Sequence, residues 1–298
     1  MKRIVLFLVT NLAVLLVLTI VARLLGLDTY LAERGSSFEG LLVWAALFGF
    51  GGAFVSLAMS KMQAKMFMGV RVIGQSPDPT EQWLLSVVEH HARAVGVGMP
   101  EVGIFDSPEP NAFATGASRN SALVAVSTGL LQRMNRQEIE AVLGHEMTHV
   151  ANGDMVTLTL IQGVVNTFVL FLARVVGNII DRAVFRSEDG RGFASYLTFY
   201  VLQIVFGLLA TPIVMWFSRQ REFRADRGGA QLAGTPNMIA ALEDLKRVHQ
   251  PLPSRQFAAF GIADGTVASG LRRLFMSHPP LDERIAALRS LGSPLGTH

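Results

Sequence analysis

The sequence predicts a mainly helical integral membrane protein with a small β-sheet in a polar domain. Half of the 298 residues are hydrophobic and only 16% are charged, whereas about 25% is usual in a soluble domain. Four apolar stretches contain no charged residue, and a helix of roughly 20 such residues crosses a bilayer core. The polar segments carry helical and strand-like patterns. This composition excludes a disordered chain and argues against a wholly soluble one.

The first two apolar stretches, residues 4–22 and 41–60, predict a pair of N-terminal transmembrane helices. Lys2 and Arg3 give the first stretch the basic start of a secretory signal. However, its apolar run is long and a second run follows soon after, which favours a retained anchor. We therefore expect residues 1–60 to form two membrane spans.

The third stretch, residues 155–173, and the fourth, within residues 192–218, predict an apolar helical hairpin over residues 155–218. The loop between them carries charges of both signs, so loop charge does not fix its orientation. Either the hairpin spans the bilayer, which its hydropathy favours, or part of it packs against the polar domain.

Basic residues at the ends of the N-terminal stretches predict the orientation of the chain. They are Lys2 and Arg3 before the first stretch and Lys61, Lys65 and Arg71 after the second. Because cytoplasmic loops are enriched in Lys and Arg, the N-terminus and residues 61–154 are expected in the cytoplasm. If the hairpin crosses twice, residues 219–298 lie on the same side. The net charge of +3, without a basic stripe, argues against a nucleic-acid partner.

The polar segment after the second stretch combines helices with a small sheet. Asp78-Pro79-Thr80 is a turn signal, and a helical pattern follows it up to Gly96. Strand-like patterns follow at residues 101–105, around 111–115 and at 122–127. A further helix begins after Asn135, a good N-cap residue with Glu138 three positions later. Beyond residue 218 the chain is expected to form helices separated by turns that contain Gly or Pro.

The helix after Asn135 contains His145-Glu146-Met147-Thr148-His149, which is a metal-binding motif. His145 and His149 are four residues apart, so both imidazoles lie on one helix face and can reach the same ion. Glu146 stands beside the first histidine, where it can accept a proton from water. The chain has no cysteine, so a metal must be held by His, Asp or Glu. The alternatives are a chance match and histidines that only form hydrogen bonds in the core.

A third ligand is expected because catalytic zinc usually has three protein ligands and one open position. Glu222 and Asp226, just after the fourth apolar stretch, share a helix face at a spacing of four residues. One carboxylate can bind the ion and the other can hold a ligand histidine. The alternative is a solvated face whose carboxylates pair with nearby arginines. An even number of membrane crossings puts Glu222 on the same side as His149, which favours the metal site.

Together with Asn111-Ala112-Phe113-Ala114-Thr115-Gly116, these motifs resemble those of the HtpX-type heat-shock membrane proteases, which are relatives of the CAAX prenyl proteases. The resemblance covers nearly the whole chain. It implies a gluzincin-like metallopeptidase domain attached to about four transmembrane helices, with one zinc ion per chain. It further implies zinc-dependent endoproteolysis of damaged or misfolded membrane proteins, as part of a stress response in the bacterial inner membrane. By this resemblance the zinc ligands are His145, His149 and Glu222, the general base is Glu146, and Asp226 orients a ligand.

Two further segments match patterns of this family. The Asn111–Gly116 segment resembles the edge strand beside the cleft, which would bind the substrate backbone as an added strand. The candidate substrate-binding residues in it are Asn111, Ala112, Phe113 and Ala114. For Asn111, an ordinary turn position is an equally good interpretation. In Ser277-His278-Pro279-Pro280, His278 either donates a hydrogen bond to the oxyanion of the tetrahedral intermediate or braces the helix that starts near Leu281.

The sequence therefore predicts a zinc metalloendopeptidase whose partners are protein substrates, especially membrane proteins, and the lipid bilayer. One alternative is a catalytically silent membrane scaffold or chaperone-like binding protein, although such a protein does not need a complete ligand set. The other is an intramembrane metalloprotease, which the charged residues flanking the metal motif disfavour. The expected order of segments is two transmembrane helices (1–60), the first part of a cytoplasmic protease domain (61–154), the apolar hairpin (155–218) and the second part of that domain (219–298).

Overall fold

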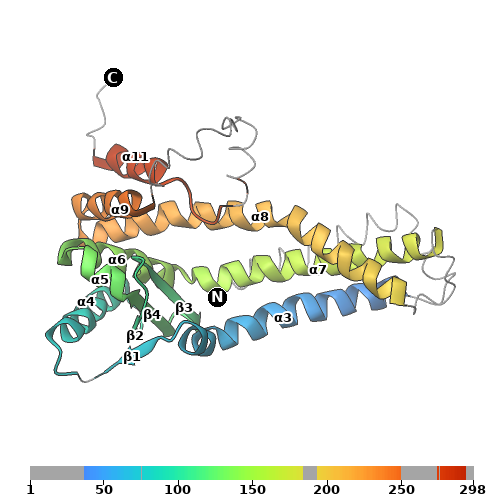
Figure 1. Ribbon diagram of the computed structural model, residues 1–298, viewed down its shortest axis with the longest axis horizontal. Helices are drawn as coiled ribbons and strands as arrows, with labels where there is room; N and C mark the ends of the chain where they lie inside the picture. Colours follow the sequence, from blue (N-terminus) through green and yellow to red (C-terminus); the bar gives the residue numbers. More distant parts are fainter. Residues whose placement is uncertain (1–36, 75, 184–192, 250–273, 275, 293–298) are drawn as a thin grey trace, which may run out of the picture. The chain divides into compact units, whose positions relative to one another are not determined.

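The computed structural model of the chain describes residues 37–74, 76–183, 193–249, 274 and 276–292 (Figure 1). The predicted first transmembrane stretch, residues 4–22, lies outside these residues. The chain divides into two compact units. The first unit contains the described parts of residues 1–56 and 159–214, and the second contains those of 57–158 and 215–298.

Three long apolar helices correspond to the second, third and fourth predicted stretches. They are α3 (Phe38–Phe67), α7 (Asp154–Ala183) and α8 (Phe193–Ala233). Among the described residues, these three helices are long and apolar enough to cross a membrane. The predicted fold class, a mainly helical membrane protein with a small sheet, is confirmed. α8 is longer than its apolar stretch because it continues without a break to Ala233, so Glu222 and Asp226 lie on the same helix.

In the first unit, the three apolar helices contact one another through a small set of side chains. Phe171 and Val175 of α7 pack around Ala45 of α3. Trp44 meets Phe199 of α8 edge-on, with 6.4 Å between the ring centroids. The outward faces are also apolar, and residues with more than half of their surface exposed include Leu47, Ile204, Leu208 and Leu209. Exposed apolar surface of this kind suits a lipid environment better than water.

The second unit contains a four-stranded sheet in the order β1-β2-β4-β3. Its strands are β1 (Arg71–Ile73), β2 (Glu101–Phe105), β3 (Ala112–Ser118) and β4 (Ser121–Ser127). β4 pairs in parallel with β2 and antiparallel with β3, and β1 pairs antiparallel with β2. The sequence pattern predicts three of these strands but not β1, because a three-residue strand is too short to show an alternating pattern. The order places β3 at an edge of the sheet.

Three of the described helices accompany the sheet, and capping residues set where they begin. They are α4 (Pro79–Val95), α5 (Thr128–Arg133) and α6 (Arg136–Asn152). Asp78, in the predicted turn, caps α4 because its side chain accepts hydrogen bonds from the backbone N–H groups of Thr80 and Glu81. α6 contacts both β3 and β4, and α4 contacts α6.

β4 is an inner strand of the sheet, and both of its faces are covered. Val124 and Val126 belong to a large core shared with α4 and α6. Leu123 and Ala125 point the other way, into a smaller core that includes Ala64 of α3. The continuous apolar run of this strand is typical of strands that are buried on both faces.

Gly116 of β3 lies very close to the backbone of β4, and its φ is +143°. A Cβ atom there would lie 2.4 Å from the carbonyl oxygen of Ser121, so the position requires glycine. The pairing register shifts between Thr115 and Ser118, which lets β3 run beyond the predicted strand at 111–115.

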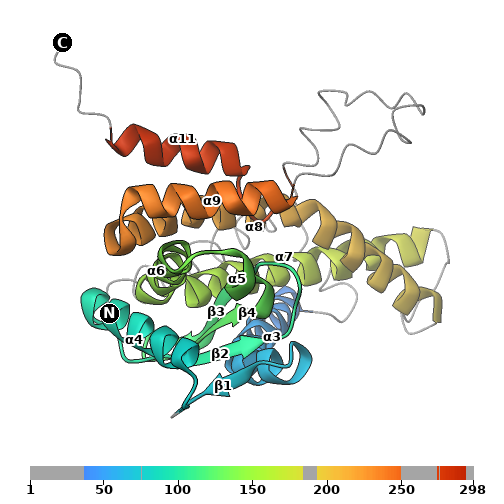
Figure 2. The ribbon, with the colours of Figure 1, turned by 60° about the vertical axis from the view of Figure 1, so that its left-hand side comes forward.

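Two helices complete the described part of the second unit. α9 (Thr235–His249) packs on α6, and α11 (Leu281–Gly292) packs on α9 (Figure 2). Leu242 of α9 and Leu288 of α11 are buried in the same core as the apolar side chains of α6. The C-terminal helices are therefore part of the domain that carries the predicted metal motif.

Candidate metal centre

α6 carries both histidines of the predicted motif, and its own sequence fixes both ends of the helix. The side chain of Asn135 accepts a hydrogen bond from the backbone N–H of Glu138, and the side chain of Glu138 accepts one from the N–H of Asn135, both at 3.0 Å. This capping box is the one that the sequence predicts. Gly153 ends the helix in the left-handed region with a φ of 63°. The metal motif therefore lies on a well-anchored helix.

Glu222 faces the two histidines because glycines let α8 approach α6 closely. A Cβ atom at Gly144 would lie 3.3 Å from the Cα atom of Gly229. A Cβ atom at Gly229 would lie 3.0 Å from the backbone nitrogen of His145. Larger side chains at these positions would push the two helices apart and carry Glu222 away from the histidines.

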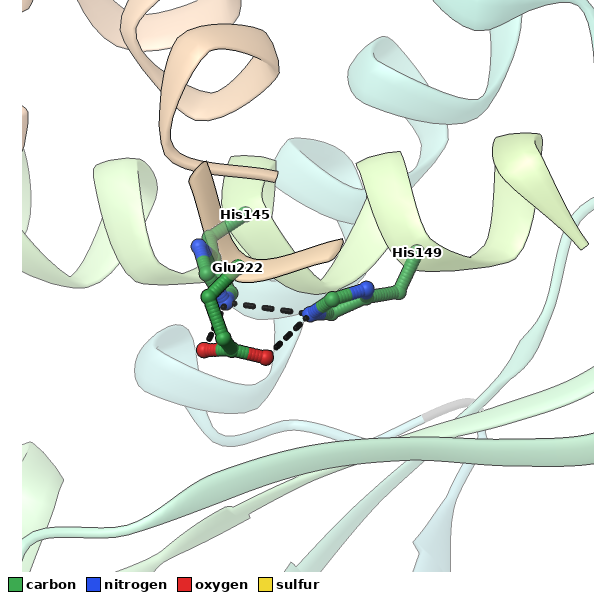
Figure 3. A group of neighbouring side chains, drawn as sticks. All are labelled: His145, His149 and Glu222. Carbon is green, nitrogen blue, oxygen red and sulfur yellow. Dashed lines mark hydrogen bonds and ion pairs between the residues drawn. The ribbon is translucent and has the colours of Figure 1, made fainter. Parts of the chain in front are cut away.

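His145, His149 and Glu222 point toward one another from the two helices (Figure 3). Nε2 of His145 lies 3.2 Å from Nε2 of His149. Oε1 of Glu222 lies 3.3 Å from Nε2 of His149, and Oε2 lies 3.6 Å from Nε2 of His145. The side chains of His145, His149 and Glu222 are 8%, 12% and 2% exposed. The structure thus gathers three potential ligand atoms in a nearly buried position.

The spacing and the chemistry of this group fit a divalent metal ion. Zinc bonds to His nitrogen and carboxylate oxygen are about 2.0–2.2 Å long, so ligands around a tetrahedral ion stand about 3.3–3.6 Å apart. The two Nε2 atoms are 3.2 Å apart, and the two oxygens of Glu222 lie 3.3 and 3.6 Å from them, so the three side chains are close to this spacing. Two histidines and one carboxylate also form a ligand set of catalytic zinc sites, which keep a further position open.

A carboxylate holds the far nitrogen of each histidine. Oδ1 of Asp226 lies 2.9 Å from Nδ1 of His145, and Oδ2 of Asp154 lies 2.7 Å from Nδ1 of His149. When the proton is on Nδ1, each histidine donates to its carboxylate and turns the lone pair of Nε2 toward the other histidine. Two facing lone pairs at this distance repel one another, and a cation between them removes the repulsion.

The carboxylates around the histidines favour positive charge at this position. Burial lowers the pKa of His149, but Asp154 and Glu222 outweigh burial and raise the pKa to about 10. Burial also lowers the pKa of His145, and the hydrogen bonds to Asp226 and Glu222 give a net increase. A bound divalent ion would supply this positive charge and leave both imidazoles neutral.

Comparison with known proteins gives the family. The model of peptidase family M48 matches residues 78–292, which include every residue of this site. The chain belongs to peptidase family M48. It is 63% identical over 295 residues to the Protease HtpX of Thioalkalivibrio sulfidiphilus, covering 98% of this chain and 99% of that relative. It is 60% identical over 291 residues to the Protease HtpX of Nitrosococcus oceani, covering 97% and 99% of the two chains.

A solved structure has a similar fold. The crystal structure of S. mikatae Ste24p superposes with a TM-score of 0.60 at 20% sequence identity, covering 95% of this chain and 67% of that one. The family resemblance inferred from the sequence motifs is therefore confirmed. As an HtpX-type member of family M48, the chain is a metalloprotease, and its substrates are proteins.

Glu146 directly follows the first histidine of the motif, a position where a carboxylate can accept a proton from water. Glu146 lies on α6 next to His145 and is half-buried. Burial raises the pKa of Glu146 above its usual range, and the nearby His145 and His149 oppose this increase only in part. A carboxyl group with a raised pKa is a better proton acceptor near neutral pH.

Arg284 reaches the site from the first turn of α11. Nη2 of Arg284 lies 2.5 Å from Oδ1 of Asp226, and Nε lies 2.8 Å from Oδ2, so the pair is bidentate. Nη1 of Arg284 also lies 3.4 Å from Oε2 of Glu222. The guanidinium is buried, so it balances part of the acidic charge and holds Asp226 toward His145.

His278 lies beside the third potential ligand. Its Nδ1 is 2.7 Å from Oε2 of Glu222, and 61% of its side chain is exposed. Arg219 of α8 holds the segment before it, because Nη1 donates to the carbonyl oxygen of Met276 at 2.9 Å. His278 therefore contacts Glu222 through one ring nitrogen, while most of its side chain stays exposed.

The predicted substrate-binding segment forms the start of the edge strand. Asn111 lies just before β3, where its N–H donates to Oγ of Ser127 at 2.9 Å and its carbonyl accepts from the N–H of Ser127 at 2.8 Å. Ala112, Phe113 and Ala114 belong to β3, which among the described strands pairs with β4 alone. β3 also contacts α6, the helix with the metal motif.

Asp154 and Arg284 are the site residues that sequence reasoning does not find. Asp154 follows the glycine that ends α6, so its position indicates only a helix end and a membrane boundary. A carboxylate five residues after His149 is nevertheless close enough to form a hydrogen bond with that histidine. This spacing is the one sequence feature that could have indicated the role of Asp154. Arg284 is one arginine on a charged terminal helix, and its spacing gives no signal of its own.

Proposed function

We propose that the chain is a zinc-dependent endopeptidase of the bacterial inner membrane that cleaves misfolded or damaged membrane proteins on the cytoplasmic side. The observation that carries this proposal is the group of His145, His149 and Glu222, whose potential ligand atoms lie within 4.8 Å of one another beside Glu146. Two histidines and one carboxylate are a ligand set of catalytic zinc sites, which keep one position open.

The residues of the site divide the steps of hydrolysis among them. A zinc ion held by His145, His149 and Glu222 would supply a Lewis acid that acidifies water and polarises the scissile carbonyl. Glu146 takes the proton of the attacking water and passes it to the leaving amine. His278, beside Glu222 and exposed, donates a hydrogen bond to the oxyanion that forms on the carbonyl.

β3 holds the substrate by its backbone. An edge strand presents unpaired N–H and C=O groups, and an extended peptide can add to it as a further strand. Asn111 and residues Ala112–Ala114 stand at the start of this edge, on the strand that contacts α6. Recognition through main-chain groups depends little on side chains, which suits an enzyme that cleaves many unfolded sequences.

Membrane proteins are the proposed substrates because the residues of the site are close in sequence to apolar segments of the chain. α6 ends at Asn152, and α7, a candidate membrane-spanning helix, begins at Asp154. Glu222 lies on α8, which is a second candidate membrane-spanning helix. Lys61 and Lys65, at the end of α3, favour a cytoplasmic location of the site.

The two alternative functions are less well supported. A silent scaffold would not need a buried ligand set whose histidines are each held by a carboxylate. An intramembrane protease would carry its motif on a spanning helix, whereas α6 is not among the candidate spans of the described residues. The first turn of α6 also contains the charged residues Arg136 and Glu138, which a membrane-spanning helix would not favour.

The test is degradation of one membrane protein in its folded and unfolded forms by the full chain, purified in detergent and loaded with zinc. We expect the unfolded form to be cleaved and the folded form to survive, and we expect a chelator to stop cleavage. Equal cleavage of the two forms would reject the proposed substrate class. Failure of the purified chain to bind zinc would reject the proposed cofactor.

Orientation is tested by cysteine labelling, because the natural chain contains no cysteine. Arg133→Cys places a single thiol at an exposed position just before α6. In intact cells whose outer membrane is permeabilised, a membrane-impermeant maleimide should not react with it, whereas inverted inner-membrane vesicles should be labelled. Labelling of the intact cells would reject the cytoplasmic location.

A further inference from the structure

Asp154 occupies a junction between the metal helix and an apolar helix. It is the first residue of α7 and follows Gly153, whose left-handed conformation ends α6. Its side chain is turned back toward α6, where Oδ2 lies 2.7 Å from Nδ1 of His149. The residue is only 3% exposed. A buried carboxylate at this position has His149 as its partner rather than solvent.

Arg221 connects the same residue to α8. Its Nη1 donates a hydrogen bond to the backbone carbonyl oxygen of Asp154 at 3.2 Å. Its Nη2 donates to Oγ of Ser218 on its own helix at 3.0 Å, which fixes the direction of the guanidinium. Arg221 immediately precedes Glu222 in the sequence. A continuous chain of contacts therefore runs from His149 through Asp154 and Arg221 to the helix turn that carries Glu222.

We propose that Asp154 and Arg221 are positioning residues of the metal centre. Asp154 fixes the ring and the protonated nitrogen of His149, so that Nε2 presents its lone pair to the ion. Arg221 holds the backbone of Asp154 against α8, which keeps His149 and Glu222 at ligand distance. The inference rests on the proposed function, because it assumes that these side chains bind zinc.

Substitution of Asp154 is expected to lower zinc affinity more than substitution of Arg221. Asp154 touches a ligand directly, and the loss of such a partner typically lowers metal affinity by about 10- to 100-fold. Arg221 acts through a backbone carbonyl, one step further from the ion, so its loss is expected to lower zinc affinity less, by about 3- to 10-fold. Asp154 is the first residue of α7, and Arg221 follows the apolar stretch of α8, so both lie on helices that are proposed to cross the bilayer.

The test is the zinc dissociation constant of the full chain in detergent, measured by competition with a chromogenic chelator. Asp154→Asn keeps the shape of the side chain and removes its charge, and Arg221→Gln removes the guanidinium. The matched controls are Asp282→Asn, at an exposed carboxylate that pairs with Lys246, and Arg227→Gln, at an exposed arginine on α8. We expect both controls to bind zinc as the natural chain does.

A spectroscopic measurement separates positioning from a general structural role. With Co²⁺ in place of zinc, the visible absorption bands report the geometry of the ligands. Asp154→Asn should change these bands, whereas Asp282→Asn should leave them unchanged. An Asp154→Asn protein with unchanged bands and a zinc affinity within twofold of the natural chain would overturn the role of Asp154.

Arg221→Gln tests the second half of the inference independently. It leaves the carboxylate of Asp154 in place, so the role of Arg221 stays testable even if Asp154→Asn does not fold. A zinc affinity equal to that of Arg227→Gln would overturn the positioning role of Arg221. If the natural chain itself binds no zinc, the proposed function fails first, and this result is distinct from either of those outcomes.

Discussion

Oδ1 of Asp226 lies 2.9 Å from Nδ1 of His145, one helical turn along α8 from Glu222. A single helix therefore supplies a potential metal ligand and also the carboxylate that orients a ligand on α6. The spacing of four residues makes this possible, because both carboxylates then project from the same helix face. A small shift of α8 along α6 would disturb both contacts together, so the packing of these two helices sets the geometry of the site.

Asp226→Asn should weaken the metal centre without removing a ligand. The amide keeps the shape of the side chain but loses the charge that holds the Nδ1 proton of His145. We expect metal affinity to fall about 10- to 100-fold, as measured by competition with a chelator. Asp244→Asn, at a carboxylate of α9 that pairs with Arg247, is the control. Equal affinities of the two variants would contradict the orienting role of Asp226.

Arg284→Ala should lower stability far more than a comparable change at the surface. It leaves the buried carboxylate of Asp226 without its bidentate partner, and breaking a buried pair in this way costs about 3–5 kcal/mol. Arg289→Ala removes an arginine of the same helix that forms an exposed pair with Glu243, and such pairs contribute about 0–1 kcal/mol. Thermal melting in detergent compares the two, and a similar drop in Tm for both would count against a buried structural role.

His91 should make the domain less stable in mild acid. It is fully buried, its Nε2 lies 3.1 Å from the carbonyl oxygen of Glu140 on α6, and burial lowers its pKa below the ordinary value of 6.5. As the pH falls through 6.5, the unfolded chain takes up a proton at His91 before the folded chain does. Stability is therefore complete above this pH and is lost progressively below it.

His91→Gln removes this titration while keeping a side-chain N–H donor. The decrease in melting temperature between pH 7.5 and pH 5.5 should be smaller in this variant than in the natural chain. His145 and His149 have raised pKa values and oppose this trend, so the difference between the two proteins is the quantity to measure. An equal decrease in both would show that His91 does not titrate on unfolding in this range.

The sequence predicts the parts of the site that depend on local spacing. The four-residue spacings of His145 with His149 and of Glu222 with Asp226 need only a helix to place each pair on one face. The capping box of Asn135 with Glu138 likewise follows from local geometry, and the structure contains it. These features lie within single helices, so no knowledge of tertiary packing is required.

The remaining parts depend on contacts between distant segments. Arg284 reaches Asp226 across 58 positions of the chain, and only the packing of α11 brings them together. Asp154 is close in sequence to His149, but its direction depends on the sharp change of path at Gly153. β1 is stabilised by pairing with β2 rather than by its own three-residue pattern, and such a strand has no periodic signal.

The central claim is that Glu146 transfers the proton in a metal-dependent cleavage. Glu146→Gln removes the base and leaves His145, His149 and Glu222 in place. Glu89→Gln, at an exposed glutamate of α4, is the matched control. The most direct measurement is zinc content together with the rate of cleavage of an unfolded protein substrate. We predict full zinc content and a rate at least about 100-fold lower for Glu146→Gln, with both values unchanged for Glu89→Gln. A zinc-loaded Glu146→Gln protein that cleaves at the natural rate would contradict the account.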